Sequence, residues 1–100
     1  MYEMSYPGRV LDAVRELIGR NPTRAVAIRA AVRKIDRILR VYPQFGQPLS
    51  DLSIPGAQRW VAVVAPFVIH YAVVEADDTG RRRQVLVSRP FALLPNAGLV

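Results

Sequence analysis

The sequence predicts an α+β domain, in which an N-terminal strand and a helical hairpin precede a three-stranded antiparallel meander. Two observations predict this fold class. Apolar residues recur at helical spacing through residues 9–41, and near-continuous β-rich runs fill residues 60–88. A chain of 100 residues with 51% hydrophobic and 22% charged residues is long and apolar enough to form one domain with its own core.

The N-terminal elements follow from short-range patterns. Residues 2–6 alternate weakly and end at the turn signal Pro7-Gly8, so we expect a short strand there. Residues 9–20 carry apolar residues at helical spacing, which predicts the first helix. These apolar residues are Val10, Val14, Leu17 and Ile18.

The second helix is predicted over residues 22–41. Asn21 is suited to the N-cap and Pro22 to the first helical position. Pro43 ends this helix. Almost no loop separates the two predicted helices, which predicts that they form an antiparallel pair. The apolar face comprises Ile28, Val32, Ile35 and Leu39.

Residues 43–58 have a loop-like composition, with three prolines and two glycines. We expect four apolar side chains to attach this segment to the core. They are Phe45, Leu49, Leu52 and Ile54.

The C-terminal half reads as a meander. Residues 60–65 and 67–75 are apolar strands separated by Pro66, and their continuous apolar character predicts burial on both faces, or nearly so. Residues 77–80 form a hairpin turn, and residues 84–88 return as the third strand. Arg89-Pro90 is expected to end the ladder, because proline has no N–H to donate. Residues 91–100 form an apolar tail with no convincing helix.

Composition excludes several functions. The chain has no cysteine and one histidine, which removes disulfides and thiolate chemistry and argues against a protein-held metal, so we expect no cofactor. Residues 60–74 are too short and too interrupted to span a membrane, and no secretory signal is visible, so a cytoplasmic location is predicted. A net charge of +6 permits a nucleic acid or an acidic protein partner. The codon bias of a GC-rich genome would also produce this many arginines.

Three local patterns carry a resemblance to a known family. The second helix closes in IDRILRVYPQFGQPLSDL, an arginine opens the next strand in RWVAVVAPFVIHYAVVE, and the last strand runs into an arginine in VLVSRPF. With the chain length and the element order, these patterns resemble the RelE/ParE superfamily of small bacterial toxins over nearly the whole chain. The resemblance implies a RelE/ParE-like fold and the toxin role in a type II toxin–antitoxin system, the class linked to plasmid stabilization.

The resemblance implies two activities and one partner. RelE-like members are endoribonucleases that cut mRNA, often on the ribosome, whereas ParE-like members poison DNA gyrase without catalysis. In both groups a cognate antitoxin neutralises the toxin. A non-toxic relative that keeps only the fold is a third reading, so the sequence leaves open whether the chain is an enzyme.

The resemblance also assigns candidate catalytic residues. Arg59 matches the family's strand arginine and Arg89 the arginine after the last strand, where each would stabilise phosphate charge. The chain departs from the family in two ways: the loop before Arg59 has no basic residue, and no tyrosine or histidine follows Tyr71. Proton transfer would therefore need His70 or Tyr71, which point to opposite faces of a strand, or a carboxylate such as Asp51 or Glu75.

Two arginine clusters have both a binding and a structural explanation. Arg81, Arg82 and Arg83 adjoin the hairpin turn and would bind nucleic-acid phosphates or merely be solvated. The second cluster lies on the polar face of the second helix, where it would meet an acidic antitoxin segment or water. Its members are Arg29, Arg33, Arg37 and Arg40.

Overall fold

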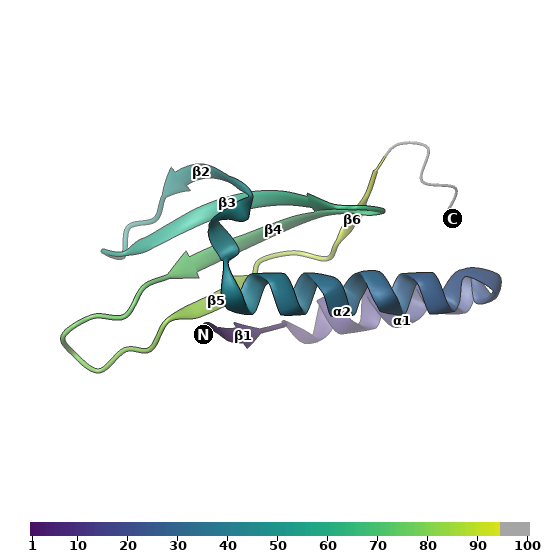
Figure 1. The fold of residues 1–100 in the computed structure, drawn as a ribbon, viewed down its shortest axis with the longest axis horizontal. Helices are drawn as coiled ribbons and strands as arrows, with labels where there is room; N and C mark the ends of the chain where they lie inside the picture. Colours follow the sequence, from purple (N-terminus) through teal and green to yellow (C-terminus); the bar gives the residue numbers. More distant parts are fainter. Residues whose placement is uncertain (95–100) are drawn as a thin grey trace.

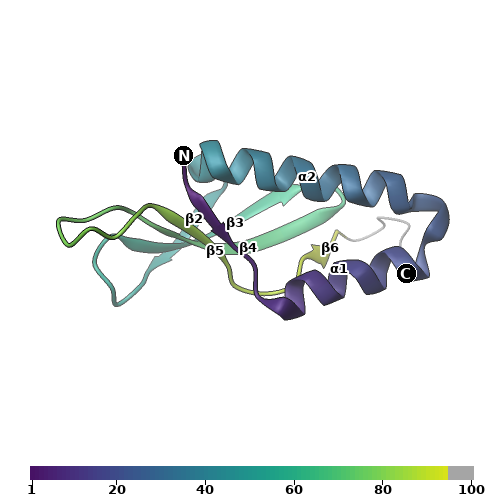
Figure 2. The ribbon, with the colours of Figure 1, turned by 90° about the horizontal axis from the view of Figure 1, so that it is seen from below.

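The computed structural model describes residues 1–94 and confirms the α+β class. The two long helices are α1 (Gly8–Arg20) and α2 (Ala25–Val41), and both lie on the same face of a single sheet (Figure 1). Figure 2 shows the helices side by side, with their connection extending past the sheet. The strands are β1 (Glu3–Ser5), β2 (Gln47–Asp51), β3 (Ala57–Val64), β4 (Phe67–Val74), β5 (Gln84–Val87) and β6 (Ala92–Leu93).

The sheet is mixed and has the order β1-β5-β4-β3-β2, with β6 also paired to β4. The predicted antiparallel meander is confirmed for β3, β4 and β5. The first strand, whose neighbour the sequence does not indicate, runs parallel to β5, with Glu3 opposite Gln84. Tyr2 N–H donates to the carbonyl of Arg40 at 2.8 Å, so β1 is also tied to the end of α2.

The expectation of a loop over residues 43–58 is wrong in its centre, where β2 forms. This strand pairs antiparallel with β3 at the edge of the sheet, and its register shifts between Pro48 and Ser50. An edge strand tolerates proline, because one side of it needs no ladder partner. Leu49 and Ile54 remain about half exposed rather than attached to the core, whereas Phe45 packs against it.

Burial on both faces, predicted for the two long apolar strands, holds better for β4 than for β3. The helices cover one face of the sheet, and β3 turns Val63 to the other, where its side chain is 58% exposed. Strand β4 is largely buried because it lies between β3 and β5. On the face that the helices do not cover, the exposed part of these two strands therefore lies mainly along β3.

The core lies between α2 and the central strands. Ile28, Ile35 and Leu39 of α2 meet Phe67 and Ile69 of β4, all with at most 1% exposure. Helix α1 contributes one fully buried residue, Val10. Burying each large aliphatic or aromatic side chain stabilises the fold by about 1.5–3 kcal/mol.

Asn21 does not cap the second helix as predicted. A short 3-10 helix, Pro22–Arg24, separates Asn21 from α2. The side-chain amide of Asn21 donates instead to the carbonyl of Leu17 at 2.9 Å. The asparagine therefore closes the last turn of α1, because that turn leaves carbonyls without helical partners.

The chain after β5 does not simply leave the sheet. Strand β5 ends at Val87, as the Arg89-Pro90 signal predicts, but β6 then pairs with the first residues of β4. The Phe91 ring packs at 5.5 Å from the ring of Phe67. No helix forms over residues 91–94, and the rest of the predicted tail lies outside the described residues. Within residues 1–94 no helix is long and apolar enough to cross a membrane.

Candidate functional site

Arg59 and His70 share the face of the sheet that the helices leave uncovered. Arg59 lies opposite Ala72, and Val61 lies opposite His70, so the arginine and the histidine are diagonal neighbours on adjacent strands. The alternation of side chains places Tyr71 on the other face, toward the helices. The expectation that His70 and Tyr71 point to opposite faces is therefore confirmed.

A hollow of about 80 Å³ brings Arg59, His70 and Arg89 together. Ser88 N–H donates to the carbonyl of His70 at 3.0 Å, which holds the end of β5 against β4 and carries Arg89 to the same place. Leu49, at the irregular point of β2, borders the hollow from the other side. The complete lining comprises Leu49, Arg59, Trp60, His70, Tyr71, Ser88 and Arg89.

The two arginines make no ion pair with a carboxylate within residues 1–94. Arg59 donates through Nε to the hydroxyl of Ser50 at 3.3 Å, which leaves most of its guanidinium donors available. Guanidinium groups without a protein counter-ion favour an external anion, and their planar fork matches phosphate oxygens.

Burial lowers the pKa of His70, and the positive charges of Arg89 and Arg59 lower it further. An ordinary histidine titrates near pH 6.5, so the imidazole of His70 is neutral at pH 7. A neutral imidazole can accept a proton, and an anion bound between the two arginines would favour the protonated form that results. The hollow therefore combines a base with two cationic groups.

Tyr71 borders the hollow, but its hydroxyl is committed elsewhere. This side chain is 1% exposed, and Oη donates to the carbonyl of Pro43 at 2.5 Å. Burial raises its pKa to about 12. The hydroxyl therefore anchors the segment before β2 to the core, and its high pKa disfavours proton transfer at neutral pH.

The two candidate carboxylates lie away from the hollow. Asp51 accepts a hydrogen bond from the side chain of Gln58 at 3.1 Å. Glu75 accepts from the hydroxyl of Tyr2 at 2.6 Å and from the amide of Gln44 at 3.2 Å. Both acids instead border a second hollow at the start of β3, and neither lines the hollow of His70.

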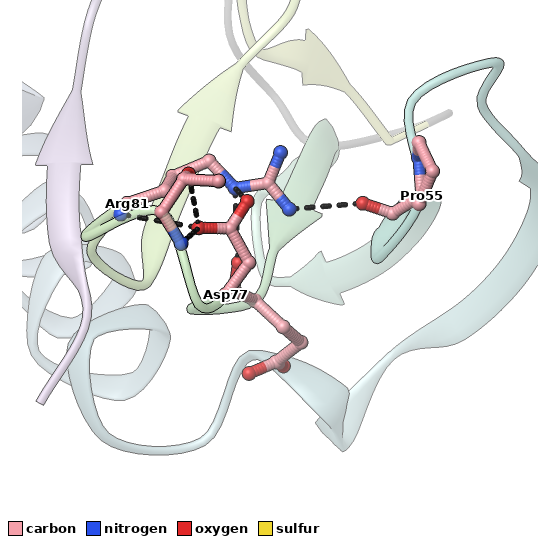
Figure 3. Close-up of polar contacts among 5 residues, drawn as sticks. Pro55, Asp77 and Arg81 are labelled. Carbon is pink, nitrogen blue, oxygen red and sulfur yellow. Dashed lines mark hydrogen bonds and ion pairs between the residues drawn. The ribbon is translucent and has the colours of Figure 1, made fainter.

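The three consecutive arginines do not form one patch, and Arg81 is structural. Its Nη2 donates to the carbonyl of Pro55 at 2.9 Å and its Nε to the carbonyl of Glu75 at 3.2 Å, while Asp77 pairs with it at 3.4 Å (Figure 3). The same aspartate accepts from the backbone N–H of Thr79. Arg81 therefore links the β4–β5 turn to the loop before β3.

The other two members of this cluster point in different directions. Arg82 makes an exposed ion pair with Glu3 at 3.0 Å. The guanidinium of Arg83 lies over the ring of Tyr2, 4.8 Å from its centre, which is a cation–π contact. The side chain of Arg82 is exposed, and its surface ion pair constrains the guanidinium only weakly.

The basic face of α2 is divided in the same way. Arg29, Arg33 and Arg37 are exposed. Arg40 instead pairs with Asp36 at 2.7 Å, and the hydroxyl of Tyr6 donates to the same carboxylate at 2.5 Å. Asp36 therefore fastens α2 to the chain after β1, with Arg40 as its partner within the helix, and the exposed basic face comprises the other three arginines.

A larger groove of about 560 Å³ lies between α1 and α2 and shares no lining residue with the hollow. Its apolar lining includes Val10, Val14, Val32 and Phe91. Arg15 of α1 and Arg33 of α2 border it from opposite sides, and Leu11 is 43% exposed at its edge.

Four residues in or next to the hollow were not predicted as site residues: Leu49, Trp60, Ser88 and Arg9. Arg9 Nη2 donates to the carbonyl of Ser88 at 2.9 Å. Pro48, which interrupts a regular strand, is the only sequence signal next to Leu49, and no local pattern indicates the other three. Residues 1–94 contain no group of three or more acidic, histidine or cysteine side chains placed to hold a metal ion. No family model, curated protein or solved structure matches the chain.

Proposed function

We propose that the chain is the toxin of a type II toxin–antitoxin system with a RelE/ParE-like fold, and that it cleaves mRNA in the cytoplasm. The observation that supports the chemistry is the hollow itself, where two arginines that pair with no carboxylate of residues 1–94 flank a neutral histidine. The sequence resemblance supports the toxin class. The sheet face that carries this group has no helix over it, which suits a long polymeric substrate.

The proposed reaction uses the ribose 2′-hydroxyl of the RNA as its nucleophile. His70 accepts the 2′ proton, the 2′ oxygen forms a bond to phosphorus, and the bond from phosphorus to the 5′ oxygen breaks. Arg59 and Arg89 stabilise the negative charge that accumulates on the phosphate oxygens. The departing 5′ oxygen takes a proton from water, and the products are a 2′,3′-cyclic phosphate and a 5′-hydroxyl end.

Cleavage is tested with purified protein and a labelled RNA, alone and on translating ribosomes. We expect His70→Ala to slow cleavage by about 10²–10⁴-fold, the usual contribution of a general base. The matched control is an RNA with 2′-O-methyl groups, which lacks the nucleophile and should stay intact. Undiminished cleavage by a folded His70→Ala protein, or cleavage of the methylated RNA, would contradict this mechanism.

Expression in cells tests the toxin role itself. Wild-type protein should arrest growth and fragment mRNA, and Arg89→Gln protein should do neither at equal abundance. Arrest with intact mRNA would instead indicate a protein target. No arrest from abundant folded wild-type protein would indicate a non-toxic relative.

The groove between the helices supports an acidic antitoxin as the partner. Its apolar floor suits the apolar side of a partner segment, and Arg15 and Arg33 would pair with carboxylates on either side. Arg29 and Arg37 extend the same positive surface along α2. Charge reversal at Arg33 should weaken binding of the co-expressed antitoxin, whereas reversal at Arg82 should leave binding unchanged.

Binding to DNA gyrase without catalysis is the second candidate function. One observation favours it. Of the four candidates for proton transfer, the two carboxylates do not line the hollow and the hydroxyl of Tyr71 is bonded to Pro43, so His70 would have to act without a second proton-transfer group. In that case purified protein should inhibit DNA supercoiling while RNA stays intact, and His70→Ala should inhibit equally well.

A further inference from the structure

Arg9 connects the first turn of α1 to the chain segment that carries Arg89. Its Nη2 donates to the carbonyl of Ser88 at 2.9 Å, although 79 residues separate the two in sequence. Ser88 is also held from the other side, because its N–H donates to the carbonyl of His70 at 3.0 Å. The residue immediately before Arg89 is therefore fixed by two elements, β4 and α1.

Arg89 needs such support because it lies between two ladders. Strand β5 ends at Val87 and β6 begins at Ala92, and the backbone of Pro90 has no N–H to donate. The carbonyl that accepts from Arg9 belongs to the peptide bond joining Ser88 to Arg89. Its orientation fixes the peptide plane that leads into Arg89 and, together with the φ angle of Arg89, sets the direction in which the side chain leaves the backbone.

Helix energetics do not explain an arginine at this position. The first turn of a helix favours acidic side chains, since unpaired N–H groups give it positive character. The first turn of α1 contains no acidic residue, and Arg9 adds a positive charge to it. A neutral or acidic residue would suit the helix better, so the bond to Ser88 is the specific interaction that Arg9 supplies.

We infer that Arg9 is a positioning residue, which holds the Ser88 carbonyl so that the guanidinium of Arg89 faces the hollow. Its role in turnover rests on the proposed ribonuclease function, whereas its effect on the geometry of Arg89 does not. Arg9 need not touch the substrate. A small displacement of a charge-stabilising group lowers turnover strongly, because its alignment with the reacting phosphate is lost.

The kinetic test compares Arg9→Gln with Arg20→Gln. Arg20 lies on the same helix, is exposed and pairs with Glu16, so its variant removes the same charge without touching Ser88. We expect Arg9→Gln to lower kcat about tenfold or more with little change in KM, by misalignment of Arg89. Arg20→Gln should change neither constant, and Arg9→Lys should restore part of the loss.

A double-mutant cycle separates positioning from a direct effect of the charge. In an Arg89→Gln background, Arg9→Gln should cause no further loss, because the group that it positions is already absent. Equal losses in both backgrounds would overturn the inference, as would an Arg9→Gln enzyme with wild-type kcat. Thermal unfolding of each variant identifies any loss that comes from misfolding.

A titration without RNA keeps the inference separate from the proposed function. The charged groups that act on the His70 imidazole are Arg89 and, from β3, Arg59. In the wild-type background, Arg9→Gln should raise the titration midpoint of His70 measured by NMR. In an Arg89→Gln background, the same substitution should raise this midpoint less. Protein that cuts no RNA but shows this dependence would retain the positioning role and lose the ribonuclease function. An unchanged midpoint in Arg9→Gln would overturn the positioning role.

Discussion

Replacing Gly46 with alanine should destabilise the fold severely, although the backbone conformation at this position suits any residue. Gly46 lies just before β2, with φ −81° and ψ −153°. An added Cβ would collide with the backbone carbonyl of Val61 and lie 2.7 Å from Oη of Tyr71 and 2.9 Å from Cβ of Ala62. The hydroxyl cannot swing away freely, because it donates to the carbonyl of Pro43 at 2.5 Å in a buried position.

The magnitude follows from these contacts. Overpacking a core typically costs about 1–3 kcal/mol, and leaving a buried carbonyl without its donor adds about 1–3 kcal/mol. The sum is roughly 2–6 kcal/mol. Since 1 kcal/mol shifts the midpoint of a domain this size by about 4–8 °C, Gly46→Ala should lower Tm by at least roughly 8 °C. Far-UV circular dichroism during heating measures this shift.

Gly19→Ala is the matched control, because no atom lies within 4 Å of a Cβ at that exposed position of α1. It should melt at or slightly above the wild-type temperature, since alanine favours a helix over glycine by about 0.5–1 kcal/mol. Gly46→Ala should cost less in a Tyr71→Phe background, which removes one of the colliding atoms. A Gly46→Ala protein that melts together with the Gly19→Ala control would refute the packing described around Tyr71.

Four further predictions concern charged groups. The His70 midpoint in NMR should lie below about 6.5 and should rise in Arg89→Gln; a midpoint above that value would contradict the electrostatics of the hollow. Because folding lowers the pKa of His70, neutral His70 contributes to the free energy of unfolding above the pKa of the unfolded chain, and this contribution is lost as pH falls through the pKa of the folded protein. His70→Gln should therefore flatten the pH dependence of the free energy of unfolding between these two pKa values. Burial raises the pKa of Asp36, but hydrogen bonds from its guanidinium and phenol partners bring it below the ordinary value. The stability that ionised Asp36 contributes is present above about pH 4 and is lost as pH falls through the lower pKa of the folded protein. At pH 7, Asp36→Asn should therefore lower the free energy of unfolding by about 1 kcal/mol, the size expected for a partly exposed pair, as measured by chemical denaturation. Arg81→Ala should lower Tm more than Arg82→Ala, since only the first links two loops; equal effects would contradict that link.

Local periodicity predicted the elements that bury a continuous apolar stripe. Helix α2 begins three residues later than expected, after the 3-10 turn, and the expected strand over residues 60–65 begins three residues earlier, at Ala57. Strand β2 escaped prediction because all five of its residues are exposed, so it shows no apolar alternation. The parallel pairing of β1 with β5 joins distant parts of the chain and leaves no local signal.

The candidate site was predictable only in part. Once the register of β3 and β4 is known, the alternation of side chains places Arg59 and His70 on the same face of the sheet, on neighbouring strands. The position of Arg89 depends on the register of β5, and the role of Arg9 depends on where α1 begins relative to Ser88. The bonds that commit Arg81 and Tyr71 to structural roles reach backbone carbonyls far away in sequence, which residue type does not reveal.

The pairing of β1 with β5 has a consequence for the order of events during translation. Gln84 follows its partner Glu3 by 81 positions in the chain, so β1 is synthesised well before the strand that it pairs with. At about 5–20 residues per second, the ribosome needs roughly 4–16 s to make the intervening chain, during which β1 has no strand to join. Arg89 is also made after this interval. A nascent chain that has not yet reached Arg89 therefore has His70 and Arg59 without it, and the three residues meet only after β5 has paired with β4.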